Sequence, residues 1–196
     1  MSFEAPSRLL NASMGDKVAA LSQFIGKNLD TRAAAPRVAG DYYLLIARSP
    51  DSPVAQALRV HTATMSALGL RVRAIFSEVE RGRAAGALNT EPFSADECRL
   101  IRDQRLLAAH EQLVLGPECA WIGDSMRRDP SKRDSFVRYA MQCPQTAMQA
   151  ARSFERLWRI SVPVDALATM PATLAPPMPD YVGTPPPRPE ALRRQS

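Results

Sequence analysis

The first regular pattern of apolar residues along the chain has the spacing of a helix. Val18, Leu21, Phe24, Ile25 and Leu29 recur at intervals that place them on one helical face. This spacing predicts an amphipathic helix over residues 16–29. A polar connector follows it.

A strand, a helix and a second strand are predicted next. The segment 41–47 reads DYYLLIA, a continuous apolar run that is typical of a buried strand. The serine or aspartate before Pro53 can cap a helix that begins at this proline and ends at Gly69. The alternating segment 70–79 predicts the second strand. Two strands joined by a helix are expected to lie parallel, with a right-handed crossover.

The second half of the chain predicts a β-hairpin and a long helix. Strands are expected over 97–102, 110–115 and 118–122, and the last two pair across a Gly-Pro turn. The segment 123–133 is polar and irregular. A helix is expected to begin at Pro144. Its predicted apolar stripe consists of Ala147, Met148, Ala151, Phe154, Leu157 and Trp158.

Proline is concentrated near the end of the chain, and this divides the sequence. Nine of its 17 prolines fall within 163–189, a segment with few large apolar residues, as is typical of an extended or disordered tail. We therefore expect an N-terminal leader and short helix over 1–39, a folded domain over 40–160 and a proline-rich, disordered tail over 161–196. The order of strands and helices predicts an α/β fold, a mixed sheet flanked by helices.

Composition argues against several classes of protein. Cys98, Cys119 and Cys143 form no Cys-x-x-Cys pair, which argues against a zinc ribbon and suits buried thiols in a reducing compartment. No apolar run reaches the roughly 18 residues that span a membrane, so we expect a cytoplasmic protein without a membrane span, and we predict no cofactor or metal. The net charge of +5 permits anionic partners.

The residues best suited to chemistry lie within 105–134. His110 opens a predicted strand, and Gly123-Asp124-Ser125 comes directly after the next predicted strand. A neutral imidazole can attack phosphorus, and cations can hold the phosphoryl oxygens, so this composition suits a phosphate site. The cations that follow the second strand are Arg127, Arg128, Lys132 and Arg133.

This segment resembles one half-motif of the phospholipase D superfamily, which reads His-x-Lys, four residues, Asp, about six residues, then Gly-Ser-x-Asn. The strand–helix–strand start, an acidic residue at Asp134 and the Phe-x-x-Leu-Trp end of the last helix extend the resemblance over roughly residues 40–160. It implies a phospholipase D-like fold. The residues that carry the motif are His110-Glu111-Gln112, Leu113 to Pro117 and Cys119 to Ser125.

The chain departs from the family's motif at its charged positions. His110 stands at the nucleophilic histidine, but Gln112 replaces the phosphate-binding lysine and Pro117 replaces the aspartate. An amide can donate a hydrogen bond to phosphate, but it brings no charge to the transition state. Arg127 or Arg128 could substitute for the lysine. The candidate catalytic residues are His110, Gln112 and Ser125, and the candidate ligand-binding residues are Asp124, Arg127, Arg128, Lys132 and Arg133.

The single half-motif also implies an oligomeric state and a function. The family places two half-motifs face to face, so a chain with one must dimerise, with His110 of each copy near the two-fold axis. We predict a non-catalytic homodimer that binds an anionic ligand or a protein partner, with nucleic acid among the ligands that stay open. Two alternatives remain: an active phosphodiesterase that uses His110 on nucleic acid or lipid, and a regulatory interaction module that works through the tail and the basic loop.

Each of these residues also has a purely structural interpretation. His110 can be a hydrogen-bonded histidine in a decayed site, and the basic loop can be neutralised by Asp129 and Asp134. His61 is expected to pack in the core or at an interface. Trp121 and Trp158 are expected to pack in the core. A solvated helix face is expected for Arg152, Arg156 and Arg159.

Overall fold

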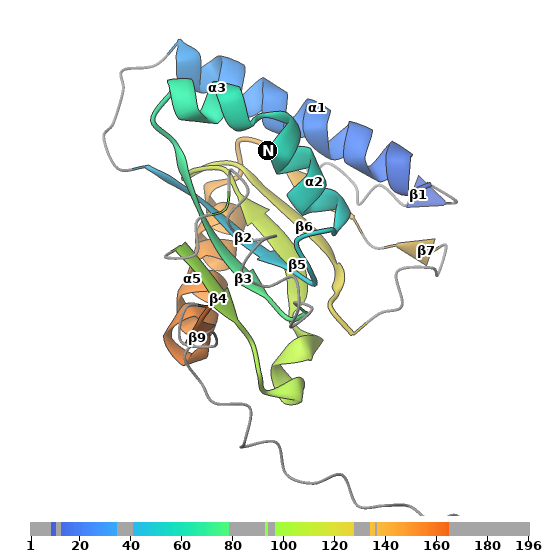
Figure 1. The fold of residues 1–196 in the computed structure, drawn as a ribbon. Coiled ribbons are helices and arrows are strands. Elements are labelled where there is room, and N and C mark those ends of the chain that lie inside the picture. The colour runs from blue at the N-terminus through green and yellow to red at the C-terminus, as the bar shows by residue number, and fades with distance from the viewer. Residues whose placement is uncertain are drawn as a thin grey trace, which may run out of the picture.

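A mixed sheet between two layers of helices organises the chain (Figure 1). The computed structural model describes residues 9–10, 13–34, 41–78, 93, 97–127, 134–135 and 137–164. Its helices are α1 (Met14–Ala33), α2 (Pro53–Val60), α3 (Thr62–Ala67) and α5 (Pro144–Ile160), with a 3₁₀ turn η2 (Gln104–Ala108). Its strands are β1 (Leu9–Leu10), β2 (Tyr42–Ala47), β3 (Arg71–Phe76), β4 (Cys98–Leu100), β5 (His110–Val114), β6 (Ala120–Ser125), β7 (Asp134–Ser135), β8 (Arg138–Ala140) and β9 (Val162–Pro163).

Seven of these strands form the main sheet, in the order β8-β6-β5-β2-β3-β4-β9. β2, β3 and β4 run parallel, and β5, β6, β8 and β9 are antiparallel to their neighbours. β1 and β7 form a separate antiparallel pair. The predicted α/β class, the parallel strand–helix–strand unit and the hairpin of β5 and β6 are therefore confirmed.

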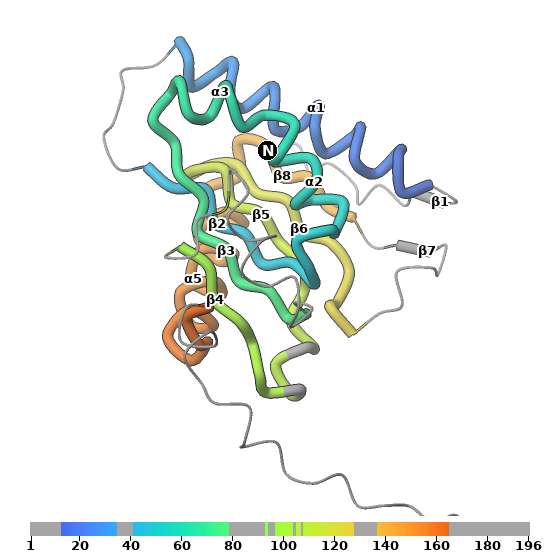
Figure 2. The backbone as a smooth tube through the Cα atoms, viewed as in Figure 1, coloured from blue at the N-terminus to red at the C-terminus, as the bar shows by residue number. Residues whose placement is uncertain are grey.

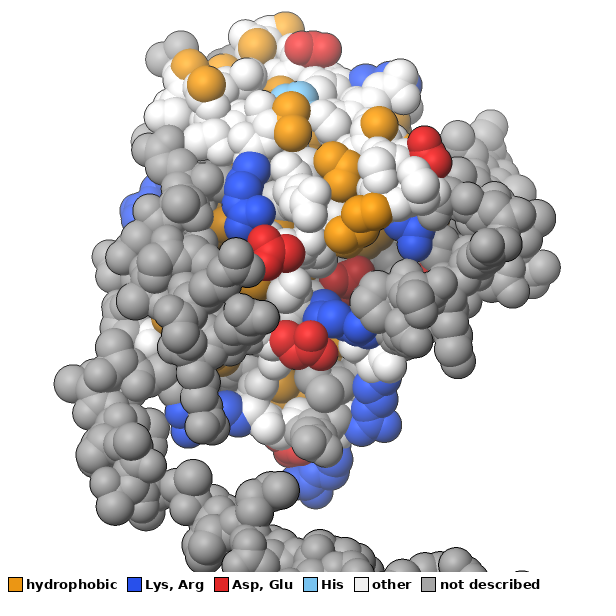
Figure 3. Space-filling model, turned by 45° about the vertical axis from the view of Figure 1, so that its right-hand side comes forward, with side chains coloured by type: hydrophobic (Ala, Val, Ile, Leu, Met, Phe, Trp, Pro, Cys, Tyr) orange, Lys and Arg blue, Asp and Glu red, His pale blue; other side chains and the backbone are white. Residues whose placement is uncertain are grey.

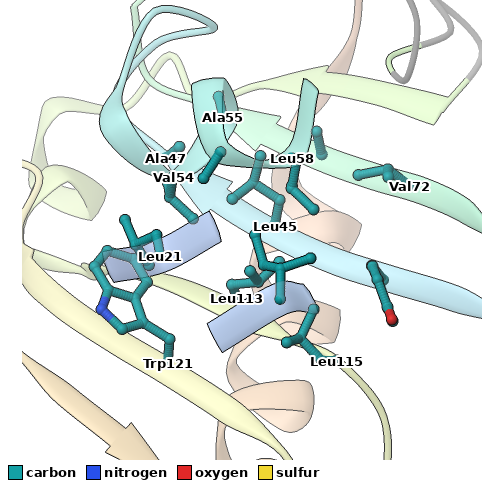
Figure 4. Close-up of a cluster of buried hydrophobic side chains, with 14 of the residues drawn as sticks. Leu21, Leu45, Ala47, Val54, Ala55, Leu58, Val72, Leu113, Leu115 and Trp121 are labelled. Carbon is teal, nitrogen blue, oxygen red and sulfur yellow. The ribbon is translucent and has the colours of Figure 1, made fainter. Parts of the chain in front are cut away.

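Each face of the sheet packs against its own helices. α1, α2 and α3 cover one face, and α5 lies against the other (Figure 2). Because side chains alternate along a strand, Leu45 joins the core on the α1 and α2 side, whereas Ile46 packs towards α5. Figure 4 shows Leu21 and Leu58 meeting Leu45 and Leu113 in the larger of these cores.

Helix α1 extends beyond the predicted range of 16–29 at both ends. Ser13 and Asp16 form a capping box at its start, which satisfies backbone N–H groups of the first turn. In its last turn, the Arg32 guanidinium forms an ion pair with Asp41 and donates to the Leu115 carbonyl at 3.3 Å. A Cβ atom at Gly116, where φ is +132°, would lie 2.7 Å from Arg32 Nη2, so this turn requires glycine. Four residues of α1 are buried in the core: Leu21, Phe24, Ile25 and Leu29.

The predicted helix from Pro53 to Gly69 is two helices, and this part of the prediction is wrong. The chain breaks at His61, whose backbone angles (φ −102°, ψ 10°) are not helical. The His61 ring contacts α1 instead, with Nε2 2.8 Å from Ser22 Oγ and 2.9 Å from the Ser22 carbonyl. His61 is therefore a packing residue between helices, as predicted. Gly69 has a φ of +69°, the conformation expected after a helix.

Two further predictions need correction. Strand β6 continues through Gly123 and Ser125, because their backbone extends the pairing with β5 towards His110. Met148 does not belong to the buried face of α5, since 46% of its surface is exposed. The buried face keeps three residues of the predicted stripe but is centred to one side of it, on Thr146, Ala147, Ala150, Phe154 and Leu157.

Of the remaining predictions, one concerns described residues of α5, and the others fall partly or wholly beyond what the structure describes. Arg152, Arg156 and Arg159 are exposed, as predicted. The segment 79–92 and the chain after residue 164, which includes most of the predicted tail, lie outside the described residues. The start of the predicted tail contributes β9, which pairs with β4. Within the described residues, no helix has both the length and the apolar character needed to cross a membrane.

Candidate functional site

Four strand ends meet at one edge of the sheet. The parallel strands β2 and β3 end at Ala47 and Phe76, and the antiparallel β5 begins beside the end of β2. His110 at the start of β5 pairs with Ser125 at the end of β6. Ligands of open α/β sheets bind outside the carboxyl ends of parallel strands, which makes this edge the candidate site. We refer to it as the His110 edge, formed by Arg48, His110, Glu111, Asp124, Ser125 and Arg127.

The His110 ring is oriented by the neighbouring strand. Its Nδ1 lies 2.8 Å from the carbonyl oxygen of Gly123. Because a carbonyl only accepts, Nδ1 carries the hydrogen, and Nε2 is the basic nitrogen of the neutral ring. His110 is exposed, and a β-bulge separates it from Gln112. This arrangement presents an imidazole nitrogen with a defined tautomer.

Glycine at position 123 is required by the ring of Trp121. A Cβ atom at Gly123 would lie 2.4 Å from Cη2 of the buried Trp121 side chain. This distance is well inside van der Waals contact. The tight fit allows the backbone of β6 to hold the carbonyl group that orients His110. Trp121 thus packs in the core, as predicted, and also supports the candidate site.

Ser125 is the last residue of β6, and Arg127 lies in the turn that follows this strand. The Ser125 hydroxyl donates to the Ala108 carbonyl at 3.3 Å and accepts from the backbone N–H of Arg127 at 3.4 Å. The N–H of Met126 donates to Ala109 at 2.9 Å. These contacts hold Ser125 beside the start of β5, so the structure brings together three predicted residues, His110, Asp124 and Ser125, with Arg127 next to them.

Two residues of this edge, Arg48 and Glu111, were not predicted from the sequence. The backbone N–H of Arg48 donates to Glu111 Oε1 at 2.9 Å, and its guanidinium donates to the Met126 carbonyl. Burial raises the pKa of the Glu111 carboxyl, and the charge of Asp124 raises it further. The hydrogen bond from Arg48 and the charges of Arg48 and Lys17 oppose this rise. Through its hydrogen bonds to Glu111 and to the Met126 carbonyl, Arg48 links the end of β2 to both strands of the hairpin.

The raised pKa of Glu111 predicts a pH dependence of stability. A carboxyl whose pKa is higher in the folded state binds more protons there, so the free energy of unfolding falls as pH rises above about 4.3, the value of an unperturbed glutamate. Glu111→Gln removes this titration. Over pH 4 to 7, we expect the wild type to lose stability relative to the variant, as measured by urea unfolding at each pH. Parallel pH profiles would contradict this assignment.

The other predicted site residues are not all at this edge. The Gln112 side chain is buried, and its Nε2 donates to the Ala150 carbonyl of α5 at 2.8 Å. Gln112 thus lies beneath the helix and anchors it to the sheet. Arg128, Lys132 and Arg133 lie outside the described residues. Among the described residues, no group of three His, Cys, Asp or Glu side chains could hold a metal ion.

A sequence signal for Arg48 did exist. It directly follows the predicted strand 41–47, at the end where ligands of parallel sheets bind. Glu111 gave a weaker signal, because it lies between two residues of the family motif. Its partner on the neighbouring strand could not be identified before the pairing of β2 with β5 was known.

Comparisons with known proteins identify similar folds but no family. No family model matches the chain, and no curated protein matches it. One similar solved structure is TrmBL2, an archaeal chromatin protein with a novel mode of DNA binding, at 8% identity and a TM-score of 0.49. That match covers 82% of this chain and 55% of the other, so the chain spans about half of TrmBL2.

A second similar structure is Nuc from Salmonella typhimurium, a phospholipase D family member. It has 14% identity and a TM-score of 0.49, and the match covers 80% of this chain and 96% of Nuc. Both matches are similarities of fold.

Proposed function

We propose that this chain is a non-catalytic, phospholipase D-like protein that binds an anionic ligand at the His110 edge as a homodimer. The observation that carries this proposal is the position of Gln112. Where the family motif has a phosphate-binding lysine, this chain has an amide that is buried and hydrogen-bonded to Ala150. This position therefore brings neither a charge nor an exposed donor to the ring of His110.

The charges of the His110 edge support binding without catalysis. Arg48 and Arg127 bring two positive charges to its described part, and Glu111 and Asp124 carry two carboxyl groups. Acidic and basic side chains are also intermixed on the face of the molecule that Figure 3 draws, below the helices. A phosphoryl-transfer transition state needs a surplus of positive charge. Binding of an anion requires less, because a few hydrogen-bond donors and one exposed arginine suffice.

The dimer follows from the count of half-motifs. The chain contains one His-x-Gln segment and one Gly-Asp-Ser segment at the His110 edge. Pairing two copies across a two-fold axis would double the donors offered to one ligand. Static light scattering at micromolar concentration tests this step, and a monomer at that concentration would contradict it.

Turnover of a bis-aryl phosphodiester tests the absence of catalysis. We expect the wild type to show no turnover above that of His110→Ala, because the buried amide of Gln112 stands where the family motif has its lysine. His110→Gln provides a second variant that retains hydrogen bonding to Gly123. Turnover that requires His110 would overturn the non-catalytic proposal and favour the phosphodiesterase.

Ligand binding can be followed through the two histidines of the chain. On addition of inorganic phosphate, the NMR signals of the His110 ring should shift, whereas those of His61 should stay unchanged. His61 is an internal control because its ring is held between α1 and α2 by Ser22. Equal shifts of both histidines, or none, would contradict a site at the His110 edge. Arg127→Ala should weaken the response of His110.

The second candidate function is an active phosphodiesterase, and one observation favours it. The contact between His110 Nδ1 and the Gly123 carbonyl makes Nε2 the basic nitrogen, as a nucleophilic imidazole requires. In this alternative Arg48 or Arg127 supplies the charge that Gln112 lacks. Loss of turnover in Arg127→Ala, in parallel with His110→Ala, would support it.

A further inference from the structure

Arginine and aromatic side chains alternate on the α5 side of the sheet. The Arg73 guanidinium lies 4.3 Å from the centre of the Tyr42 ring and 5.7 Å from that of Trp158. Arg71 lies 5.6 Å from Tyr42, and Arg99 lies 4.5 Å from Trp158. We call these five residues, from β2, β3, β4 and α5, the arginine–aromatic array.

The array carries more positive than negative charge. Its only acidic contact among the described residues is Glu97, which pairs with Arg71 at 2.6 Å and Arg73 at 3.4 Å. The array therefore has three guanidinium groups and one neighbouring carboxylate, which pairs with two of them. The Arg71 side chain is 56% exposed and that of Arg73 is 37% exposed, whereas Glu97 is 11% exposed. The positive groups face solvent, and the negative group lies beneath them.

Not every arginine of the array is available to a ligand. Arg99 donates to the carbonyls of Trp158 at 2.6 Å and Ser161 at 3.5 Å. It therefore caps the carboxyl end of α5, where a cation is favourable. Arg71 and Arg73 are left as the groups that can reach a partner. Three further arginines of α5 are exposed: Arg152, Arg156 and Arg159.

We propose that the arginine–aromatic array binds single-stranded nucleic acid, with Arg71 and Arg73 contacting the phosphate backbone. Both guanidinium groups already lie against the Tyr42 ring. This contact reduces the side-chain entropy that the two arginines lose when they bind a phosphate. Arg71 and Arg73 are two residues apart on β3, so their side chains leave the same face of the sheet roughly 6.6 Å apart. The planar groups then offer several N–H donors to successive phosphates.

Nucleic acid suits this surface better than an acidic peptide. Bases of a single strand can stack on guanidinium planes and on aromatic rings, and a peptide carboxylate gains nothing from such stacking. Tyr42 and Arg73 are half-buried, so part of each remains accessible for a flat partner. A duplex keeps its bases stacked and would use only the phosphate contacts.

The array is separate from the His110 edge. Tyr42 is the first residue of β2 and Ala47 is the last. These two residues are therefore roughly 16 Å apart along the strand. The array lies towards the amino ends of β2 and β3, whereas the His110 edge lies at the opposite ends. Binding to the two sites can therefore be tested with different variants.

Fluorescence anisotropy with a labelled oligothymidylate tests the proposal. Arg71→Ala should weaken binding about tenfold and make it less salt-dependent, because one phosphate contact is lost. Glu97→Gln should strengthen binding, since it removes the carboxylate while keeping the side-chain shape. Lys27→Ala removes one exposed charge from α1, on the other layer, and should change little.

Several outcomes would overturn this proposal. Unchanged binding in both Arg71→Ala and Glu97→Gln would show that the array only packs the sheet. An equal loss of affinity for oligothymidylate in Lys27→Ala would show that binding depends only on the net charge of the protein. Tighter binding of a duplex of mixed sequence, or displacement by oligoglutamate at the same concentration as by unlabelled oligothymidylate, would assign the surface to another partner. Circular dichroism of each variant establishes that it is folded.

Discussion

Replacing Phe154 by alanine is expected to lower the free energy of unfolding by about 3–5 kcal/mol. Phe154 is fully buried and joins Ile46, Ile75 and Leu157 in the core beneath α5. Its ring also stacks on Trp158, with centroids 5.3 Å apart. Truncation removes these contacts and leaves a cavity that the rigid sheet cannot fill. Urea unfolding followed by tryptophan fluorescence measures the loss.

Met148 provides the matched control on the same helix. It is 46% exposed, so Met148→Ala should change the free energy of unfolding by no more than about 0.5 kcal/mol. The sequence pattern had placed both residues in one apolar stripe. Equal losses in the two variants would contradict the orientation of α5 described above, whereas a large difference would establish which face of the helix meets the sheet.

The periodicity of the sequence predicted the elements better than their ends. The apolar run of β2 and the Gly-Pro turn between β5 and β6 are local signals, and both predictions are confirmed. The break at His61 depends on a contact with Ser22 of α1, 39 residues away in the sequence. The extension of β6 to Ser125 likewise depends on pairing with β5. Long-range contacts of this kind override local spacing and cannot be read from one segment.

The candidate site likewise combines residues that local sequence predicts with an environment that long-range contacts determine. His110, Asp124 and Ser125 could be selected from residue types and spacing, because a hairpin brings its two strand ends together. The environment of Gln112 could not be predicted, since its hydrogen bond reaches Ala150, 38 residues further along the chain. Arg71, Arg73 and Arg99 come from two strands, and the rings that they contact belong to Tyr42 of β2 and Trp158 of α5. None of these three arginines was distinguished in the sequence.

The contrast between motif position and environment matters most at Gln112. An alignment of motifs would treat Gln112→Lys as the restoration of a lost phosphate-binding residue. In the fold, however, residue Gln112 is only 5% exposed, and its side chain reaches from β5 to a carbonyl group of α5. A lysine here would bring its ammonium group to a carbonyl of the helix rather than to the ring of His110. The two interpretations predict opposite results for the same variant.

Gln112→Lys is therefore expected to destabilise the fold by about 3–5 kcal/mol at neutral pH, the cost of a buried and unpaired charge. Burial favours the neutral amine and lowers its pKa in the folded state, so the loss should shrink as pH rises towards about 10. Urea unfolding across this pH range measures both effects. Gln112→Met, which fills similar space without charge, should cost only about 1 kcal/mol with no such pH dependence. A lysine variant as stable as the wild type and newly active on a bis-aryl phosphodiester would instead place residue 112 at the His110 edge.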